Sequence, residues 1–382
     1  MNENPQARQS TWVEVDLQAI RNHVRYLVEM TGTEVMVVVK ADGYGHGAVP
    51  VARAALEAGA SWCAVARADE ALELRDAGLD CPLMMLGYTP EGRIAELLNL
   101  GVRLPFWSEA QAARIQAAAE QVGATAYLHL KVDTGMSRLG VQADQAVELV
   151  RVLERYPDLE LEGIFTHFAR ADEADPKPTR QQEVLFEQVL SALDQDRLRP
   201  PLVHAANSAA SLKRPSAHYD LLRFGISLYG LEPSPESPLP SAFQPALAWK
   251  SVLSQVKVLP AGRGVSYGHI YTTSGEERIG TIPVGYADGY HRVTGTEVLV
   301  RGTRVPVIGR VCMDQIMVNL DEVPGARAGD EVVLVGRQGE CSYTADDLAR
   351  AWNSINYEVV CAISARVPRY YQAAAPKKQP RD

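Results

Sequence analysis

The sequence lacks basic stripes, membrane-length apolar runs and an apolar leader, and each absence excludes a class of protein. Asp and Glu outnumber Lys and Arg, giving a formal net charge of −9, so nucleic acid is not an expected partner. No apolar run approaches the roughly 20 residues that cross a bilayer. The first residues, MNENPQARQSTW, carry no apolar signal segment. We therefore expect a cytoplasmic protein that does not bind membranes.

Paired cysteines and two common binding motifs are absent as well. The five cysteines are odd in number and widely spaced, with no C-x-x-C pair, which favours reduced thiols. No phosphate loop of the form G-x-x-x-x-G-K-[ST] occurs. His129 and Asp133 alternate along one strand with Lys131 between them, and because lysine interrupts the ligand set, we predict no metal site.

The chain does contain a regular alternation of short apolar runs with segments of helical period, which is typical of βα units. Eight runs predict strands, at residues 35–40, 62–66, 82–87, 103–107, 126–132, 161–167, 202–206 and 221–225. Seven segments predict helices, at residues 17–29, 49–58, 68–77, 91–100, 108–122, 144–155 and 179–193. This rhythm predicts a (β/α)8 TIM barrel in an α/β protein of 382 residues, because a doubly wound sheet usually has fewer strands.

The pattern changes after the barrel. Residues 232–245, EPSPESPLPSAFQP, are rich in proline and serine and predict a linker. Short runs bounded by Gly and Pro follow and predict a mainly β C-terminal domain, at residues 249–258, 278–284, 297–300, 303–308, 315–320 and 331–335. We expect the barrel over residues 12–240, the β domain over 241–372 with residues 1–11 able to pack against it, and a disordered tail over 373–382.

The segment VMVVVKADGYGHG places Lys40 at the end of the first barrel strand. Active sites of such barrels lie at the C-terminal ends of the strands. Burial lowers the pKa of a lysine, and its free amine can then form a Schiff base with a carbonyl. A lysine at a strand end can also extend into solvent, so this segment alone leaves both interpretations open.

The later strand ends bring cations, amides and hydroxyls to the same rim. They are Lys131 and Arg138 after the fifth strand, His167 after the sixth, Asn207 and Ser208 after the seventh, and Arg223 with Gly225 and Ile226 at the eighth. Loops after the seventh and eighth strands of such barrels often bind a phosphate. A lysine that can form an imine in the same mouth as a phosphate cradle predicts pyridoxal 5′-phosphate (PLP) as the cofactor.

Nine segments together resemble the alanine racemase family, in the family's order and over nearly the whole chain. They are VVVKADGYGHG, LKVDTGMSRLG, THFARADE, NSAASL, RFGISLYGL, VSYGHIYTT, VGYADGY, GRVCMDQ and INYEVVCAISARVPR. The resemblance implies a PLP-dependent isomerase that interconverts L-alanine and D-alanine, supplying D-alanine for peptidoglycan. Small departures from the family pattern occur at Arg170 and Ser137, and they bear on the polarity of the access corridor rather than on the chemistry.

The resemblance also assigns roles to the catalytic groups. It implies that Lys40 holds PLP and that Tyr267 is a second base, supplied by the β domain of the other subunit of a homodimer. Racemisation needs a base on each face of a planar carbanion. A tyrosine with a pKa near ~10 needs activation to act as one, and the resemblance implies His167 as its hydrogen-bond partner. Arg223 would contact the pyridine nitrogen, to which arginine can donate a hydrogen bond but give no proton.

Further roles are implied for residues around this centre. Arg138 would contact the cofactor and the substrate carboxylate, and Lys131 would be either carbamylated or an ordinary lysine. The implied phosphate-binding set is Tyr44, Ser208, Gly225, Ile226 and Tyr357, and Asn207 is a further cofactor-binding residue. Met313 and Asp314 would close the substrate pocket, and the residues of an access corridor would be Asp172, Tyr286, Arg292, Arg310 and Ile355.

Three alternatives remain beside this interpretation. A PLP decarboxylase of basic amino acids would carry a glutamate where Arg223 stands. A PLP-carrier protein would lack the β domain and with it Tyr267. A racemase of broader scope, or one that prefers serine, would use the same apparatus with a pocket of different width.

Overall fold

The computed structural model describes residues 8–372, which divide into two compact units. One unit consists of the residues up to Gln18, the short segment Tyr44–Gly47 and the residues from Pro245 onward. The other consists of Ala19–Gly43 and Ala48–Gln244. We call them the sheet unit and the barrel unit and describe each by itself. Among residues 8–372, no helix is both long enough and apolar enough to cross a bilayer.

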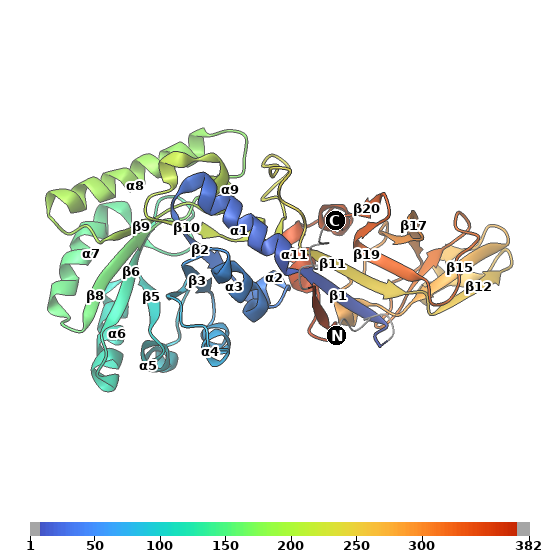
Figure 1. Ribbon diagram of the computed structural model, residues 1–382, viewed down its shortest axis with the longest axis horizontal. Helices are drawn as coiled ribbons and strands as arrows, with labels where there is room; N and C mark the ends of the chain where they lie inside the picture. Colours follow the sequence, from blue (N-terminus) through green and yellow to red (C-terminus); the bar gives the residue numbers. More distant parts are fainter. Residues whose placement is uncertain (1–7, 373–382) are drawn as a thin grey trace, which may run out of the picture. The chain divides into compact units, whose positions relative to one another are not determined.

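The barrel unit contains eight parallel strands in the described chain, which confirms the predicted fold class (Figure 1). Their order is β10-β2-β3-β4-β5-β6-β8-β9. At the seam, the Arg223 N–H donates to Ala206 O (3.1 Å) and the Asp220 N–H to Val203 O (3.0 Å), so the barrel is nearly closed. The strands are β2 (Glu34–Val38), β3 (Trp62–Val65), β4 (Leu83–Met85), β5 (Val102–Phe106), β6 (Ala126–Asp133), β8 (Leu159–Phe165), β9 (Leu202–His204) and β10 (Leu221–Phe224), with the short β7 (Val141–Gln142) beside β6.

Helices cover the outside of these strands, as the alternating pattern predicts. Because both faces of a parallel strand are then buried, its residues are apolar in succession, and Val35, Met36 and Val37 are fully buried. The helix predicted to start at residue 108 begins with an N-cap, since Ser108 Oγ accepts from the Gln111 N–H at 3.3 Å. The helices are α1 (Leu17–Thr31), α3 (Ala48–Glu57), α4 (Ala68–Asp76), α5 (Ile94–Asn99), α6 (Glu109–Val122), α7 (Ala146–Val152), α8 (Lys177–Gln195) and α9 (Ser208–Lys213); the predictions did not include α9.

The sheet unit is built on ten strands among the described residues, in the order β12-β15-β18-β17-β16-β19-β11-β1-β21 with β20 beside β19. All its pairs are antiparallel except β1 with β21. The strands are β1 (Thr11–Asp16), β11 (Leu247–Val252), β12 (Gln255–Leu259), β15 (Glu277–Ile282), β16 (Glu297–Val300), β17 (Thr303–Ile308), β18 (Ile316–Asn319), β19 (Glu331–Gln338), β20 (Cys341–Tyr343) and β21 (Arg369–Gln372), and β13 (Gly264–Val265) pairs separately with β14 (Tyr271–Thr272).

Several boundaries differ from the sequence predictions. The expected start of the barrel at residue 12 falls inside β1, which pairs with β11 and β21 and therefore belongs to the sheet unit (Figure 1). The single run predicted over residues 249–258 is two strands, because the chain turns between Val252 and Gln255. Helices α10 (Ala345–Trp352) and α11 (Asn356–Ala362) were not predicted in the β domain. The tail expected over residues 373–382 lies outside the described residues.

Candidate active site

Lys40 lies two residues beyond the end of β2, in a turn rather than at the strand end where it was predicted. The short element α2 (Lys40–Tyr44) is left-handed, since Ala41, Asp42 and Gly43 have φ values of 53°, 52° and 59°. Left-handed turns cost non-glycine residues roughly 1–2 kcal/mol each. The Glu70 carboxylate accepts from the Ala41 N–H (2.7 Å) and Asp42 Oδ1 from the Ala48 N–H (2.9 Å), so side chains stabilise the strained turn that carries Lys40.

Arg223, on β10, is a buried cation surrounded by neutral acceptors. It is 3% exposed, and its guanidinium donates to Thr166 O (2.8 Å), Ala205 O (2.7 Å) and His204 Nδ1 (2.9 Å). None of its hydrogen-bond partners among residues 8–372 is a carboxylate. Burial lowers the pKa of Arg223 to about 9, so the group stays charged at neutral pH. A glutamate at this position, as a decarboxylase would need, is excluded by the sequence.

The positive charge of Arg223 affects the pKa of two neighbouring groups, His167 and Lys131. Burial, and then the charge of Arg223, hold the pKa of both groups well below the usual values. Lys131 is 7% exposed, and its Nζ has no hydrogen-bond partner within the described chain. That nitrogen lies 4.6 Å from the centre of the Phe165 ring. Burial and the nearby cations therefore favour the neutral form of the Lys131 amine, which has no hydrogen-bond partner among the described residues.

Two further imidazoles, His129 and His204, are fully buried in this unit. Burial lowers the pKa of both, so the folded state keeps them neutral below the pH at which unfolded histidine protonates, about 6.5. The unfolded chain then binds protons that the folded chain does not. We expect the free energy of unfolding to fall from about pH 6.5 downward, by up to about 1.4 kcal/mol per pH unit for each imidazole. Urea unfolding midpoints that stay constant between about pH 6.5 and 5 would contradict this.

The loop after β6 presents Arg138 at the barrel rim. Asp133 Oδ1 accepts from the N–H groups of Gly135 and Ser137, both at 3.0 Å, which folds the loop back on the strand end. Partial burial raises the pKa of Asp133, but the backbone donors outweigh burial and the net shift is downward. Arg138 is exposed. A carboxylate that stays ionised therefore organises the segment from which Arg138 extends.

The loops after β9 and β10 are tied together by Ser208. Its Oγ accepts from the Gly225 N–H at 2.9 Å and the Ser227 N–H at 3.4 Å. Asn207 caps α9 by accepting from the Ala210 N–H at 3.1 Å. Ile226 begins the short 3-10 turn that follows β10. The predicted phosphate-loop residues of the barrel unit are thus brought together by the fold.

Two other predicted phosphate ligands, Tyr44 and Tyr357, belong to the sheet unit. Their ring centres are 6.3 Å apart. The segment that carries Tyr44 fits tightly against α11, because a Cβ at Gly45 would lie 2.1 Å from Val360 O. The Arg369 guanidinium donates to Gly45 O at 3.1 Å. Close backbone contact therefore explains why glycine stands at position 45.

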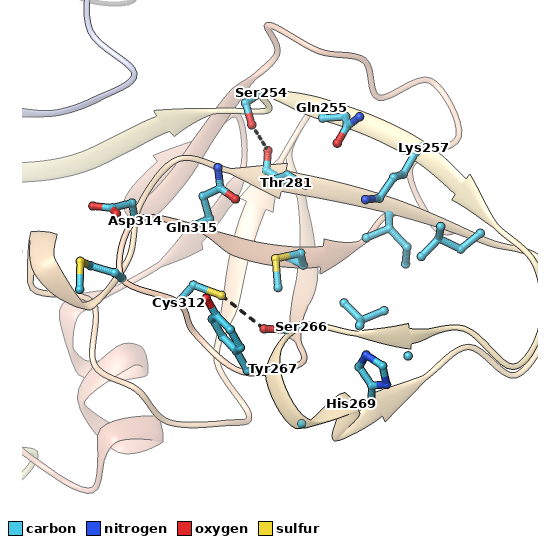
Figure 2. Close-up of a pocket in the computed structure, with 17 residues that line it drawn as sticks. Ser254, Gln255, Lys257, Ser266, Tyr267, His269, Thr281, Cys312, Asp314 and Gln315 are labelled. Atoms are coloured by element: carbon cyan, nitrogen blue, oxygen red, sulfur yellow. Dashed lines mark hydrogen bonds between the residues drawn. The ribbon is translucent and has the colours of Figure 1, made fainter.

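Tyr267 lies in the sheet unit, on an exposed turn between β13 and β14. Figure 2 shows it beside Ser266 and Cys312, in the wall of a pocket of about 810 Å³. Ser266 has a φ of 63°, and its Oγ donates to Arg310 O at 2.6 Å. The Tyr267 side chain is 68% exposed, which is unusual for a large aromatic residue that serves only packing.

The segment that carries Met313 and Asp314 lines the same pocket. The Ala287 N–H donates to Met313 O at 3.0 Å, and Arg366 pairs with Asp314 at 2.8 Å. Among the predicted corridor residues, Arg292 and Arg310 line a separate pocket of about 290 Å³. Tyr286 and Ile355 are exposed in the same unit, whereas Asp172 lies in the barrel unit. The predicted site residues therefore form two groups, one in each unit.

Sequence reasoning missed several polar residues of the site. His204, which contacts Arg223 directly, and Glu162, on β8, were not singled out, and His129 was considered only as a metal ligand. The position of His204 at the end of the seventh barrel strand was a usable signal. No sequence signal marked Arg366 as the partner of Asp314.

Comparison with known proteins decides the family. Residues 15–233 match the alanine racemase N-terminal domain, and residues 246–371 match the C-terminal domain. The chain belongs to the alanine racemase family. An alanine racemase of Symbiobacterium thermophilum is 46% identical over 364 residues, covering 94% of this chain and 97% of the relative. One of Geobacillus stearothermophilus is 45% identical over 372 residues, covering 94% and 93%.

Solved structures of the alanine racemase family agree with the fold described above. The crystal structure of alanine racemase from Bacillus anthracis with bound L-Ala-P has a TM-score of 0.91 at 40% identity and covers 96% of both chains. That of alanine racemase from Streptomyces lavendulae has a TM-score of 0.92 at 39% identity, covering 98% of this chain and 99% of the other. The predicted membership of the alanine racemase family is confirmed.

Proposed function

We propose that this protein is a PLP-dependent isomerase that interconverts L-alanine and D-alanine with two bases, Lys40 and Tyr267. The observation that carries the proposal is Arg223, a buried cation whose partners are all neutral. Such a group can donate a hydrogen bond to the pyridine nitrogen of PLP but does not transfer a proton to it. When bound, PLP withdraws electrons from the substrate and so acidifies its α-carbon.

The residues of the chain fit this cofactor. The buried guanidinium of Arg223 has no carboxylate among its hydrogen-bond partners in the described residues, so its charge suits an anionic ligand that accepts hydrogen bonds. We assign the covalent attachment to Lys40. The phosphate group would be held by Tyr44, Ser208, Gly225, Ile226 and Tyr357, Asn207 would contact the cofactor, and Arg223 would donate to the pyridine nitrogen.

The proton transfers fall to residues of both units. Lys40 takes the α-proton of D-alanine and Tyr267 that of L-alanine, and the opposite base returns a proton to the other face. Arg223 donates weakly to His167 Nδ1 at 3.4 Å, which leaves the proton of a neutral imidazole on Nε2. In that form His167 can donate to the Tyr267 oxygen and stabilise its phenolate. Arg138, Met313 and Asp314 would hold the substrate, and Asp172, Tyr286, Arg292, Arg310 and Ile355 would line its access corridor.

We assign a homodimer, with Tyr267 of one subunit serving the active site of its partner, and cytoplasmic action. Support for the dimer is the exposure of Tyr267 and Met313, 68% and 53%, on one pocket wall. Large apolar side chains gathered on a surface often mark an interface. The assignment to the cytoplasm is supported by the five cysteines of the sequence, which are odd in number and contain no C-x-x-C pair.

Lys131 should react with carbon dioxide, because burial lowers the pKa of its amine and so favours the neutral, nucleophilic form. The amine adds to CO2 and releases one proton, and the resulting carbamate anion would accept hydrogen bonds from Arg138. We expect a carbamate carbon signal in NMR spectra after incubation with 13C-bicarbonate, and its loss in Lys131→Met. A Lys177→Met variant is the control, since Lys177 is exposed. Absence of the signal would leave Lys131 an ordinary lysine.

Incubation with single enantiomers tests the function. We expect L-alanine and D-alanine each to lose optical rotation and approach an equal mixture, with serine turned over more slowly and lysine not at all. Faster turnover of serine than of alanine would identify a serine-preferring racemase. Release of CO2 from lysine would point to a decarboxylase and overturn the proposal.

A further inference from the structure

A line of hydrogen bonds leads from Arg223 through the barrel interior to Glu162. The guanidinium NH1 lies 2.9 Å from His204 Nδ1. His204 Nε2 lies 2.9 Å from His129 Nδ1, and His129 Nε2 lies 3.0 Å from Glu162 Oε2. The four residues come from the strands β10, β9, β6 and β8, which share one barrel sheet (Figure 1).

The chemistry of the two ends determines the direction of every bond in this line. Arginine only donates, so His204 Nδ1 must accept and its proton must lie on Nε2. His129 Nδ1 then accepts from His204, and the proton of His129 also lies on Nε2. The Glu162 carboxylate only accepts, which agrees with this direction. Both imidazoles are therefore neutral and carry the same tautomer.

Strand β8 is irregular at the point where it supplies Glu162. In the pairing of β6 with β8, Leu128 faces Leu161 and His129 faces Gly163, so Glu162 is an extra residue in a bulge. Bulges redirect a side chain and are common next to active sites. The His129 ring fills the space beside Gly163, where a Cβ would lie 2.4 Å from Nδ1. The local backbone is thus shaped to admit the imidazole and to turn the carboxylate toward it.

Arg103 holds the far end of the line in place. Its Nε donates to Glu162 Oε2 and its NH2 to Oε1, each at 3.1 Å. Burial raises the pKa of Glu162, but His129 and Arg103 together lower it more. The carboxylate is therefore ionised and fixed in orientation. A negative charge stands at one end of the line and the Arg223 cation at the other.

We propose that Glu162, His129 and His204 are positioning residues that act through one another on Arg223, keeping its guanidinium charged and oriented toward the cofactor's pyridine nitrogen. This rests on the function proposed above. If His204 were protonated, it would be a cationic donor facing the cationic donor Arg223. The Glu162 carboxylate polarises the two neutral imidazoles, and His204 Nδ1 therefore accepts strongly from Arg223. Apolar residues usually fill the interior of such barrels. The polar line is therefore better explained by the demands of Arg223 than by packing.

The first test observes the imidazoles in the unmodified full-length protein. We expect 15N NMR of histidine-labelled protein to show His129 and His204 with bare Nδ1 and protonated Nε2, unchanged between about pH 6 and 8. The eight histidines give few signals, and the signals lost in His129→Gln and in His204→Gln assign these two residues. A proton on Nδ1 of either residue, or titration in this range, would overturn the proposal. The tautomers are read from the spectrum of the unmodified protein, and the test needs no turnover.

The second test compares Glu162→Gln with Glu183→Gln. Glu183 is likewise a buried carboxylate held by an arginine, Arg214, at 2.7 Å, but its hydrogen bonds within the described residues go to Arg180, Arg214 and Ser216 and not to an imidazole. We expect Glu162→Gln to shift the 15N signals of His204, which Glu162 does not touch. It should also lower kcat about tenfold or more with little change in KM, and alter the absorbance of the bound cofactor.

Glu183→Gln should leave the His204 signals, the cofactor absorbance and kcat as in the parent protein, whatever it does to stability. Equal behaviour of the two variants would mean that the line is structural only, and would overturn the proposal. The predicted tautomers and the predicted racemase activity can be contradicted separately. A parent protein that shows the expected tautomers but does not racemise alanine would contradict the proposed function. The direction of the hydrogen bonds between Arg223 and Glu162 would still be supported.

Discussion

Replacing Lys40 by alanine should abolish racemisation in both directions. The variant loses the amine that attaches the cofactor and the base for D-alanine together, and loss of one general base alone costs about 10²–10⁴-fold in rate. We therefore expect turnover to fall by at least about 10⁴-fold, with no cofactor fixed to the protein by borohydride reduction. Optical rotation of D-alanine and L-alanine measures the rate, and mass analysis of the reduced protein measures attachment.

The control for this variant is Lys177→Ala. Lys177 is exposed at the start of α8 and should be replaceable without loss of turnover or of cofactor attachment. The left-handed turn after Lys40 makes a folding control necessary, so the urea midpoint of Lys40→Ala should lie close to that of the parent. Turnover that survives in a folded Lys40→Ala protein would refute the assignment of this residue.

Replacing Tyr267 by phenylalanine should remove only one of the two proton transfers. The ring stays and the phenolic oxygen is lost, so L-alanine loses its base while Lys40 still serves D-alanine. Racemisation should fall by about 10²–10⁴-fold. In D2O, the α-hydrogen of D-alanine should still exchange, and that of L-alanine should not. Proton NMR of each enantiomer distinguishes the two outcomes.

Tyr88→Phe is the matched control, because Tyr88 is also exposed, at 58%, but lies in the barrel unit. It should racemise alanine at the parent rate. If the α-hydrogens of both enantiomers exchange equally in Tyr267→Phe, then Tyr267 is not the base for L-alanine.

Mixing the two inactive variants tests the shared site. When Lys40→Ala and Tyr267→Phe subunits are dissociated and reassociated together, a heterodimer contains one site with both native residues. We therefore expect activity to return in the mixture, to a fraction of the parent value. If each subunit used its own Tyr267, no site in the mixture would hold both residues and no activity would return.

Local patterns predicted the repeating part of the fold well. The apolar run around Val35–Val37 had to be a strand buried on both faces, and Ser108 with Gln111 had to begin a helix, since both signals lie within a few residues. Strand ends follow from the same patterns only within two residues, which is why Lys40 was assigned to the strand and not to the turn. The N-terminal β1 was missed because its partners β11 and β21 lie more than 200 residues away in the sequence.

The sequence by itself determined the barrel and the following β domain, because periodicity is local, and the short motifs around Lys40 and Tyr267 predicted the catalytic residues. Only the tertiary structure decided that Lys131 is buried without a hydrogen-bond partner among the described residues and that His204, His129 and Glu162 form one line to Arg223. Burial and hydrogen bonding between different strands depend on the closure of the barrel. No window of neighbouring residues contains that information.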